Sequence, residues 1–232
     1  QYDIVGTGGQ CVMYLDKDID VAQDSTPYFW YNAGGVATNI LLTLISIIVV
    51  KYTDMGIVGS SFFTLMAFAG IALALLNGIP MNMGAGINND GRNILMLSRS
   101  ARNRRLFIRS LQIIGELGHG IQPKDMPKEW FSSELPTGGN DYFGIVSYIS
   151  YISLLEDEGL WNEACIAYEQ LNNVKPKLPC KLAALYAIEL QHNKNEKKAL
   201  QLYEELQRRK DMFYLPGETA MALNIVEQIA KL

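Results

Sequence analysis

Two long uncharged runs dominate the first half of the chain. Residues 25–50 and 55–89 contain no Asp, Glu, Lys or Arg, and between them lies the short polar turn Lys51–Asp54. An apolar stretch of about 17 or more residues is long enough for a helix to span a bilayer. Two such stretches joined by so short a turn predict an antiparallel transmembrane helical hairpin, with spans at about 34–51 and 55–77.

The second apolar run does not continue as a regular helix. Helix-breaking residues follow it: Asn77, Gly78, Pro80, Gly84 and Gly86. They predict a re-entrant or broken segment, because irregular backbone at membrane depth is tolerated where protein buries it or where it lines a cavity. A helix then resumes over residues 90–110.

One acid, Asp90, stands at the end of this uncharged region and precedes Gly91. An ionised carboxylate in or near hydrocarbon is costly, which makes Asp90 a candidate functional residue. The alternative is that Asp90 serves as the N-cap of the helix that follows. Asn39, inside the first span, likewise has two interpretations, a helix–helix hydrogen bond or a contact with a substrate.

The second half of the chain is charged and repetitive. Residues 123–140, with three prolines and the pair Gly138 and Gly139, are interpreted as a linker, and residues 141–232 as a soluble α-helical domain. Identical residues recur in this domain at an offset of 35: Tyr151 and Tyr186, Leu155 and Leu190, Ala164 and Ala199, Tyr168 and Tyr203, Glu169 and Glu204, Leu171 and Leu206. A period near 34 built from two helices is typical of tetratricopeptide repeats, which bind peptides or regulatory proteins on a concave surface.

Charge and cysteine usage narrow the picture. The net charge of −4 does not favour a nucleic-acid partner. Six arginines lie between Arg92 and Arg109 with no acid among them, so the positive-inside rule places this side, residues 1–24 and the C-terminal domain in the cytoplasm. Three cysteines without metal-ligand spacing are expected to be reduced thiols. A start at Gln1, without a signal-peptide pattern, is expected of a piece of a longer protein.

Four motifs resemble a known family: Gly8-Gly9-Gln10-Cys11, Gly35-x-x-x-Asn39, Asn77-x-x-Pro80 and Asn89-Asp90-Gly91. Together they resemble the second half of a site-2-type intramembrane zinc metalloprotease, of the branch found in Gram-positive bacteria. The resemblance covers about residues 1–110, and its most specific part is Asn-x-x-Pro followed by Asn-Asp-Gly. It implies an integral protein of the bacterial cytoplasmic membrane that hydrolyses membrane proteins or peptides within or near the bilayer.

The resemblance also implies roles for individual residues. Asp90 corresponds to the third ligand of the zinc ion. The glycine-containing hairpin or edge strand at residues 1–24 corresponds to a substrate-binding strand through Gly8 and Gly9. The remaining substrate-groove residues implied by the family are Asn39, Asn77, Pro80 and Asn89, within a membrane core at residues 25–110.

The chain departs from the family in one respect. The His-Glu-x-x-His motif, which carries the other two zinc ligands and the general base, is absent, so no catalytic residue is assigned. The nearest imitation, Gly115–His119, has glycine at the first histidine position, and we expect Glu116, His119 and His192 to be solvent-exposed surface residues. Besides the protease, a non-catalytic membrane-anchored adaptor and a piece of a transporter are alternatives, the last because broken helices are common in transporters.

Overall fold

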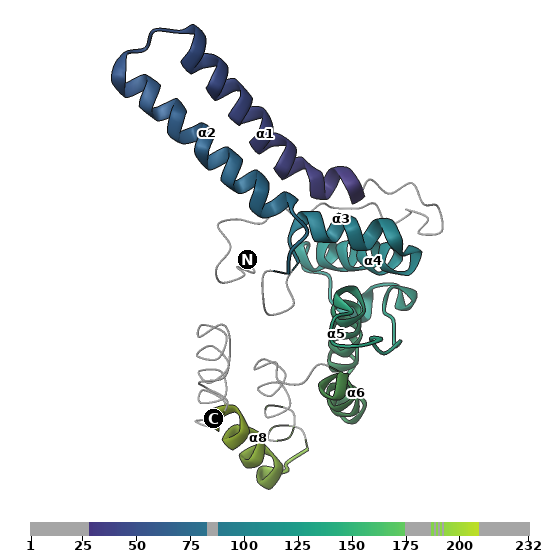
Figure 1. Cartoon of the computed structure of the whole chain (residues 1–232). Helices are drawn as coiled ribbons and strands as arrows, with labels where there is room; N and C mark the ends of the chain where they lie inside the picture. Colours follow the sequence, from purple (N-terminus) through teal and green to yellow (C-terminus); the bar gives the residue numbers. More distant parts are fainter. Residues whose placement is uncertain are drawn as a thin grey trace. The chain divides into compact units, whose positions relative to one another are not determined.

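The computed structural model describes residues 28–82, 88–174, 187, 189, 191 and 193–208. Figure 1 traces the chain, whose described residues divide into two compact units with a boundary in the sequence between residues 105 and 106. The described residues are mainly helical, and their one β-type contact is an isolated bridge between Asn82 and Asn88. The prediction of a mainly α fold is confirmed for this part of the chain.

The first unit is built on a helical hairpin. Helix α1 comprises Tyr28–Tyr52 and helix α2 comprises Gly56–Gly78, so they contain 25 and 23 residues. At about 1.5 Å of rise per residue, both exceed the roughly 30 Å thickness of a hydrocarbon core. Their mean hydropathy values, 2.2 and 2.0, are also those of helices long and apolar enough to cross a membrane. The predicted hairpin is therefore present, and α1 begins six residues before the predicted span because its first turn includes the aromatic residues from Tyr28.

Small and polar residues fill the contact between α1 and α2. Thr43 and Ser46 of α1 are buried, as are Ala67 and Gly70 of α2, and the Thr43 hydroxyl donates to the Ala67 carbonyl at 3.5 Å. Gly70 permits close approach, because a Cβ there would lie only 3.0 Å from the carbonyl oxygen of Asn39. Small residues at the interface are the usual means by which membrane helices pack closely.

The large apolar side chains of the hairpin point outward. Only 11% of the residues in the most apolar stretch of each helix are buried, and Phe68, for example, is 69% exposed. A core helix of a water-soluble protein would bury such side chains. The outward face of the hairpin is therefore suited to a lipid environment.

Two short helices follow the hairpin instead of the single helix expected over residues 90–110. Helix α3 comprises Asp90–Arg99 and helix α4 comprises Ala101–Gly118, separated by the extended residue Ser100. The break is stabilised locally, since Ser100 Oγ accepts from the Asn103 amide at 3.2 Å and Arg104 Nη1 donates to the Leu97 carbonyl at 2.7 Å. These bonds satisfy groups that a helix terminus leaves without partners.

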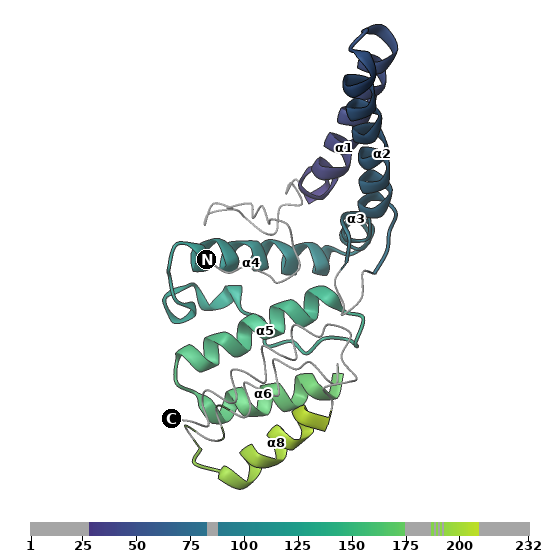
Figure 2. The same ribbon diagram turned by 90° about the vertical axis from the view of Figure 1, so that its left-hand side faces the viewer.

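The second unit contains paired helices. Helix α5 comprises Tyr142–Asp157 and helix α6 comprises Trp161–Val174, and the turn between them uses Gly159 at φ +74°, a conformation that favours glycine. Figure 2 shows the two helices side by side. Their core consists of Ile145, Tyr148, Ile152, Leu155, Ala164, Cys165, Ala167, Tyr168 and Leu171. A further helix, α8, comprises Glu196–Arg208, and the helix positions agree with the helical pattern expected after residue 141.

The segment at residues 123–140 differs from the predicted linker. Two 3₁₀ turns, η1 at Pro123–Asp125 and η2 at Lys128–Trp130, lie within it. Met126, Trp130 and Phe131 are buried in one cluster with Ile113 of α4 and Leu154 of α5. Prolines predicted a linker, but a proline also fits the start of a short helix, and the aromatic side chains between the prolines supply apolar surface to bury.

Candidate functional site

Asp90 begins α3 at the open end of the hairpin, which we define as the end that contains Tyr28 and Gly78, opposite the turn at residues 53–55. The next residue, Gly91, packs directly on the end of α2. A Cβ at Gly91 would overlap the Gly78 carbonyl oxygen and would lie 3.2 Å from the carbonyl oxygen of Asn77. The glycine after Asp90 is thus required by close backbone contact.

Asn89 fixes the backbone around Asp90. It is the N-cap of α3, where its Oδ1 accepts from the amides of Arg92 at 3.0 Å and Met81 at 2.9 Å. Its Nδ2 donates to the carbonyls of Leu76 at 2.7 Å and Ile79 at 2.5 Å. All four hydrogen-bonding positions of this buried amide are therefore occupied.

The carboxylate of Asp90 is left without such partners. No hydrogen bond or ion pair joins it to the residues that the structure describes, and partial burial raises the pKa of Asp90 above its usual value. One of its oxygens lies 3.7 Å from the position that a Cβ of Gly35 would take. Asp90 and the Gly35 position of the sequence motif are therefore neighbours in space. The alternative in which Asp90 is the N-cap is wrong, because Asn89 makes that contact.

A polar contact between α1 and α3 holds this arrangement. Asn93 Nδ2 donates to Oδ1 of the buried Asn32 at 3.2 Å, and Asn32 Nδ2 donates to the Tyr28 carbonyl at 2.7 Å. Sequence reasoning did not single out Asn32. The signal that was available is an amide one residue beyond an aromatic cluster at the start of an apolar helix, where an unpaired amide would be costly.

The other residues predicted for the substrate groove occupy different places. Asn77 is half-buried and contributes its backbone carbonyl near Gly91, whereas Pro80 is exposed. Asn39 is half-buried one turn beyond Gly35 in α1, with its backbone carbonyl against Gly70. Gly8 and Gly9 lie outside the described residues. The structure thus gathers Asn77, Asn89 and Asp90 at one end of the hairpin and places Asn39 farther along the α1–α2 contact.

A metal site is not completed by this part of the chain. Within the described residues, no group of three His, Cys, Asp or Glu side chains is placed to hold a metal ion. Asp90 is chemically suited to be one zinc ligand, and two further ligands would have to come from elsewhere. The described residues therefore supply one of the ligands that a zinc site needs.

The Gly115–His119 segment lies near the end of α4. His119 is exposed as expected, and its Nδ1 lies 2.8 Å from the Gly115 carbonyl. The expectation for Glu116 is wrong, because this residue is only 2% exposed. The physical reason is that the last turns of α4 are buried over much of their circumference, including Ile113 and Gly115. His192 lies outside the described residues.

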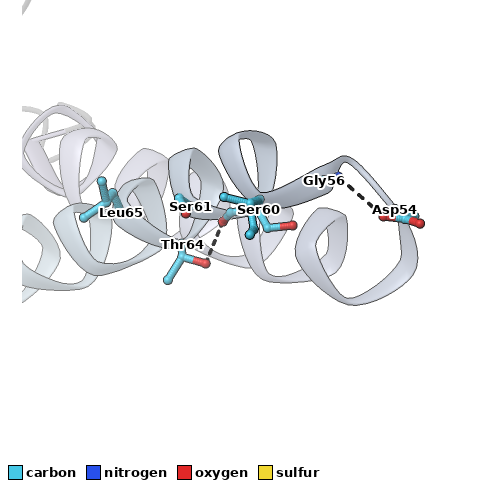
Figure 3. Close-up of a pocket in the computed structure, with 7 residues that line it drawn as sticks. Asp54, Gly56, Ser60, Ser61, Thr64 and Leu65 are labelled. Carbon is cyan, nitrogen blue, oxygen red and sulfur yellow. Dashed lines mark hydrogen bonds between the residues drawn. The ribbon is translucent and has the colours of Figure 1, made fainter.

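A hollow at the opposite end of the hairpin is lined by polar side chains of the first turns of α2. Figure 3 shows Asp54, Ser60, Ser61 and Thr64 there, with the Thr64 hydroxyl donating to the Ser60 carbonyl at 2.7 Å. Asp54 accepts from the Gly56 amide at 3.4 Å. The hollow is open and is lined also by the apolar side chains of Ile57 and Leu65, so we regard Asp90, and not this hollow, as the candidate site.

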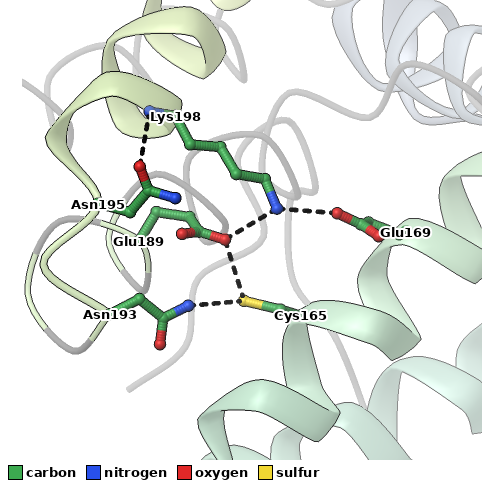
Figure 4. Close-up of polar contacts among 6 residues, drawn as sticks. All are labelled: Cys165, Glu169, Glu189, Asn193, Asn195 and Lys198. Carbon is green, nitrogen blue, oxygen red and sulfur yellow. Dashed lines mark hydrogen bonds and ion pairs between the residues drawn. The ribbon is translucent and has the colours of Figure 1, made fainter.

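A second polar cluster lies in the C-terminal unit (Figure 4). Lys198 Nζ lies 2.9 Å from carboxylate oxygens of both Glu169 and the buried Glu189. These two bonds, that to Glu169 first, raise the pKa of Lys198. Cys165 Sγ donates to Glu189 at 3.8 Å and accepts from Asn193 at 3.8 Å. Burial and then the Glu189 charge raise the pKa of the Cys165 thiol to about 11, so this free cysteine is protonated and unreactive at neutral pH.

Comparison of the chain with protein-family models, curated proteins and solved structures gave no match. The resemblance to the site-2-type proteases therefore stays a prediction that rests on the four sequence motifs.

Proposed function

We propose that this chain is the C-terminal part of a membrane-embedded zinc metalloprotease in which Asp90 is one of the zinc ligands. The observation that carries the proposal is that the neighbouring residues Asn89 and Asp90 differ in their hydrogen bonding. Asn89 supplies the helix cap and is fully hydrogen-bonded, whereas the Asp90 carboxylate, beside Gly35 at the end of two membrane-length helices, has no hydrogen bond or ion pair with the described residues. An acid kept in this setting without a partner is typical of a functional group.

Zinc, when bound, would lower the pKa of a bound water to about 7 and so supply hydroxide within or near the bilayer. The residues of this chain would bind the zinc ion and hold it in place. Asp90 would bind the metal through a carboxylate oxygen, and Asn89 and Gly91 would hold α3 against α2 so that this oxygen keeps its place. The proposal requires two histidines and a glutamate from a His-Glu-x-x-His segment outside this chain.

The same proposal assigns the substrate and the location. The substrate is a membrane protein or peptide, bound through Gly8 and Gly9 and beside Asn39, Asn77, Pro80 and Asn89. The hairpin lies in the bacterial cytoplasmic membrane and the C-terminal domain in the cytoplasm. That domain is a tetratricopeptide-like repeat that docks a peptide or regulatory protein, which the buried, small Ala164 and Ala199 at corresponding repeat positions support.

The proposal is tested by the Asp90→Asn substitution in the full-length protein, which is purified from membranes and assayed for zinc content and for cleavage of a membrane substrate. Asn89 keeps the cap, so the variant is expected to accumulate normally while zinc content and proteolysis fall to background. Asp54→Asn, at the hairpin turn, is the matched control and is expected to retain both. Unchanged zinc and full proteolysis in Asp90→Asn would reject Asp90 as a ligand.

A second candidate is a non-catalytic membrane anchor that displays the helical domain for protein binding. It is favoured by the well-packed α5–α6 pair, whose tyrosine hydroxyls are engaged across the pair, Tyr148 with Gln170 at 2.7 Å and Tyr168 with Glu156 at 3.0 Å. The residues encoded upstream of Gln1 discriminate between the candidates. A His-Glu-x-x-His motif in an apolar helix supports the protease, and its absence supports the anchor.

A further inference from the structure

Two arginines in the segment that follows the hairpin, Arg99 and Arg105, have side chains without a partner among the described residues. Arg99 is the last residue of α3 and Arg105 lies in the first turns of α4, and both are exposed. No hydrogen bond or ion pair joins either guanidinium to a described residue. Their neighbours are used differently, since Arg104 donates to the last carbonyls of α3.

The local packing ties the first turn of α3 to the open end of the hairpin. The bond from Asn93 to Asn32 ties α3 to the start of α1, and Gly91 abuts the last residue of α2. Beside Asn32 on α1, Trp30 and Phe29 are 70% and 47% exposed. Exposed aromatic side chains at the end of an apolar helix mark the headgroup region of a bilayer.

The sequence around these two arginines is strongly basic. No acidic residue occurs between Asp90 and Glu116, while Arg92, Arg99, Arg102, Arg104 and Arg105 follow one another in this stretch. Guanidinium groups match phosphate oxygens through paired hydrogen bonds and are more weakly hydrated than ammonium groups. Clusters of basic groups at a membrane surface attract anionic lipids.

We propose that Arg99 and Arg105 form a binding surface for the headgroups of anionic phospholipids at the open end of the hairpin. This inference rests on the membrane insertion included in the proposed function, and it is independent of zinc and of proteolysis. Bound headgroups would hold α3, and with it Asp90, at a fixed depth.

The test uses the full chain, purified in a neutral detergent and titrated with short-chain phosphatidylglycerol or with phosphatidylcholine of the same acyl length. Phosphatidylglycerol is expected to bind more tightly, and its affinity is expected to fall as salt is raised. A basic side chain near an anionic surface contributes roughly fivefold in affinity, so the Arg99→Gln/Arg105→Gln pair is expected to weaken phosphatidylglycerol binding about 25-fold. Equal affinity of the native chain and this pair, or of the two lipids, would overturn the proposal.

Matched variants separate charge from folding. Lys194→Gln/Lys197→Gln removes the same charge from exposed positions in the C-terminal unit and is expected to leave lipid affinity unchanged. Arg99→Lys/Arg105→Lys keeps the charge and is expected to retain most of the affinity. If the glutamine pair does not fold, each single glutamine variant is expected to show about a fivefold loss, and the absence of any loss would equally count against the proposal.

Two competitors distinguish the source of the phosphate. Inorganic phosphate is expected to displace phosphatidylglycerol only at far higher concentration, because it lacks the acyl chains that the hairpin holds. Displacement at equal concentration would assign the arginines to free phosphate and overturn the lipid proposal. A single-stranded RNA oligonucleotide is the second competitor. The lipid proposal would also be overturned if this RNA bound more tightly than phosphatidylglycerol and if the glutamine pair lost that binding. The two proposals can fail separately. If the arginine variants lose lipid affinity but keep their zinc, the protease proposal is unaffected. If Asp90→Asn loses zinc but keeps its lipid affinity, the lipid proposal is unaffected.

Discussion

At the scale of single residues, Asn89 contributes most to the geometry of the candidate site. Its amide connects four backbone groups from α2, from the segment after α2 and from α3. Two of those groups, the carbonyls of Leu76 and Ile79, lie at the end of α2, where helix carbonyls lack intrahelical partners. One side chain thus satisfies the end of one helix and the start of the next.

We predict that Asn89→Ala destabilises the chain by about 2–4 kcal/mol, because it removes the cap and leaves buried backbone groups unpaired. Asn89→Asp is expected to be similarly harmful, since the carboxylate still caps α3 but places a negative oxygen against the carbonyls of Leu76 and Ile79. Unfolding by a denaturing detergent provides the measurement. The control is Asn88→Ala, which removes only a contact with the Met96 sulfur at 3.3 Å and is expected to cost less than about 1 kcal/mol.

The sequence located Asp90 but not the way in which it is held. An Asp followed by Gly at the end of an uncharged run is visible in the sequence, whereas the choice of Asn89 over Asp90 as cap depends on where the α2 carbonyls lie. The same limit explains Glu116. Its burial results from packing around α4, and no local pattern distinguishes a glutamate that is buried by its neighbours from one on a solvated face.

Cys165 provides a second prediction at this scale. In a variant with Cys11→Ser and Cys180→Ser, the remaining thiol is expected to react with a disulfide reagent at pH 8 only after the protein is unfolded. Its pKa is about 11 in the folded chain, whereas an unfolded thiol has a pKa of about 8.5. The folded state therefore keeps the proton longer, so the thiol's contribution to stability is present below about pH 8.5 and is lost as the pH rises to about 11.

Unfolding measured across this alkaline range is the check. Cys165→Ser, which removes the titrating thiol, is expected to reduce the decline in stability with pH. An identical decline in both chains would show that the thiol does not contribute, and rapid reaction of the folded chain at pH 8 would show that Cys165 is accessible.

At the scale of the elements, the contact between α2 and α3 depends on glycine. Any side chain at position 91 meets the backbone of Gly78, which cannot rotate away as a side chain would. We predict that Gly91→Ala destabilises the first unit by about 1–3 kcal/mol through overpacking. It is also expected to displace Asp90.

Gly34→Ala is the matched control for Gly91→Ala, because a Cβ at Gly34 meets nothing within 4 Å. In a helix this change is expected to be neutral or to stabilise by up to about 1 kcal/mol. Denaturation of the two variants under the same conditions gives the comparison. If Gly91→Ala is as stable as Gly34→Ala, α3 does not need its close contact with α2.

Elements marked by long periodic patterns were predictable, and those marked only by helix breakers were not. The hairpin follows from two uncharged runs, each longer than a membrane is thick, and α5 and α6 follow from helical spacing. The segment at residues 123–140 was interpreted as a linker from its prolines and glycines. Its burial comes from Trp130 and Phe131, whose partners Ile113 and Leu154 lie in helices on either side of it in the sequence.

At the scale of the whole molecule, the two units differ in the kind of side chains that they expose and pair. The first unit carries long apolar helices with outward apolar side chains, and arginines follow these helices in the sequence. The second carries paired helices joined by side-chain ion pairs such as that of Lys198 with Glu169 and Glu189. Such a division is typical of a membrane anchor followed by a water-exposed domain.

This division predicts a topology that can be measured. The arginines follow α2 without an acid before Glu116, so the positive-inside rule places α3 in the cytoplasm and the turn at residues 53–55 outside. In a chain without native cysteines, Tyr52→Cys and Ser98→Cys introduce exposed thiols near the two ends of the hairpin, and Lys194→Cys introduces one in the C-terminal unit. A membrane-impermeant maleimide is expected to label position 52 in right-side-out vesicles, and positions 98 and 194 in inside-out vesicles. Labelling of 52 and 98 from the same side would show that α1 and α2 do not separate these positions across the bilayer, and the membrane hairpin would have to be abandoned.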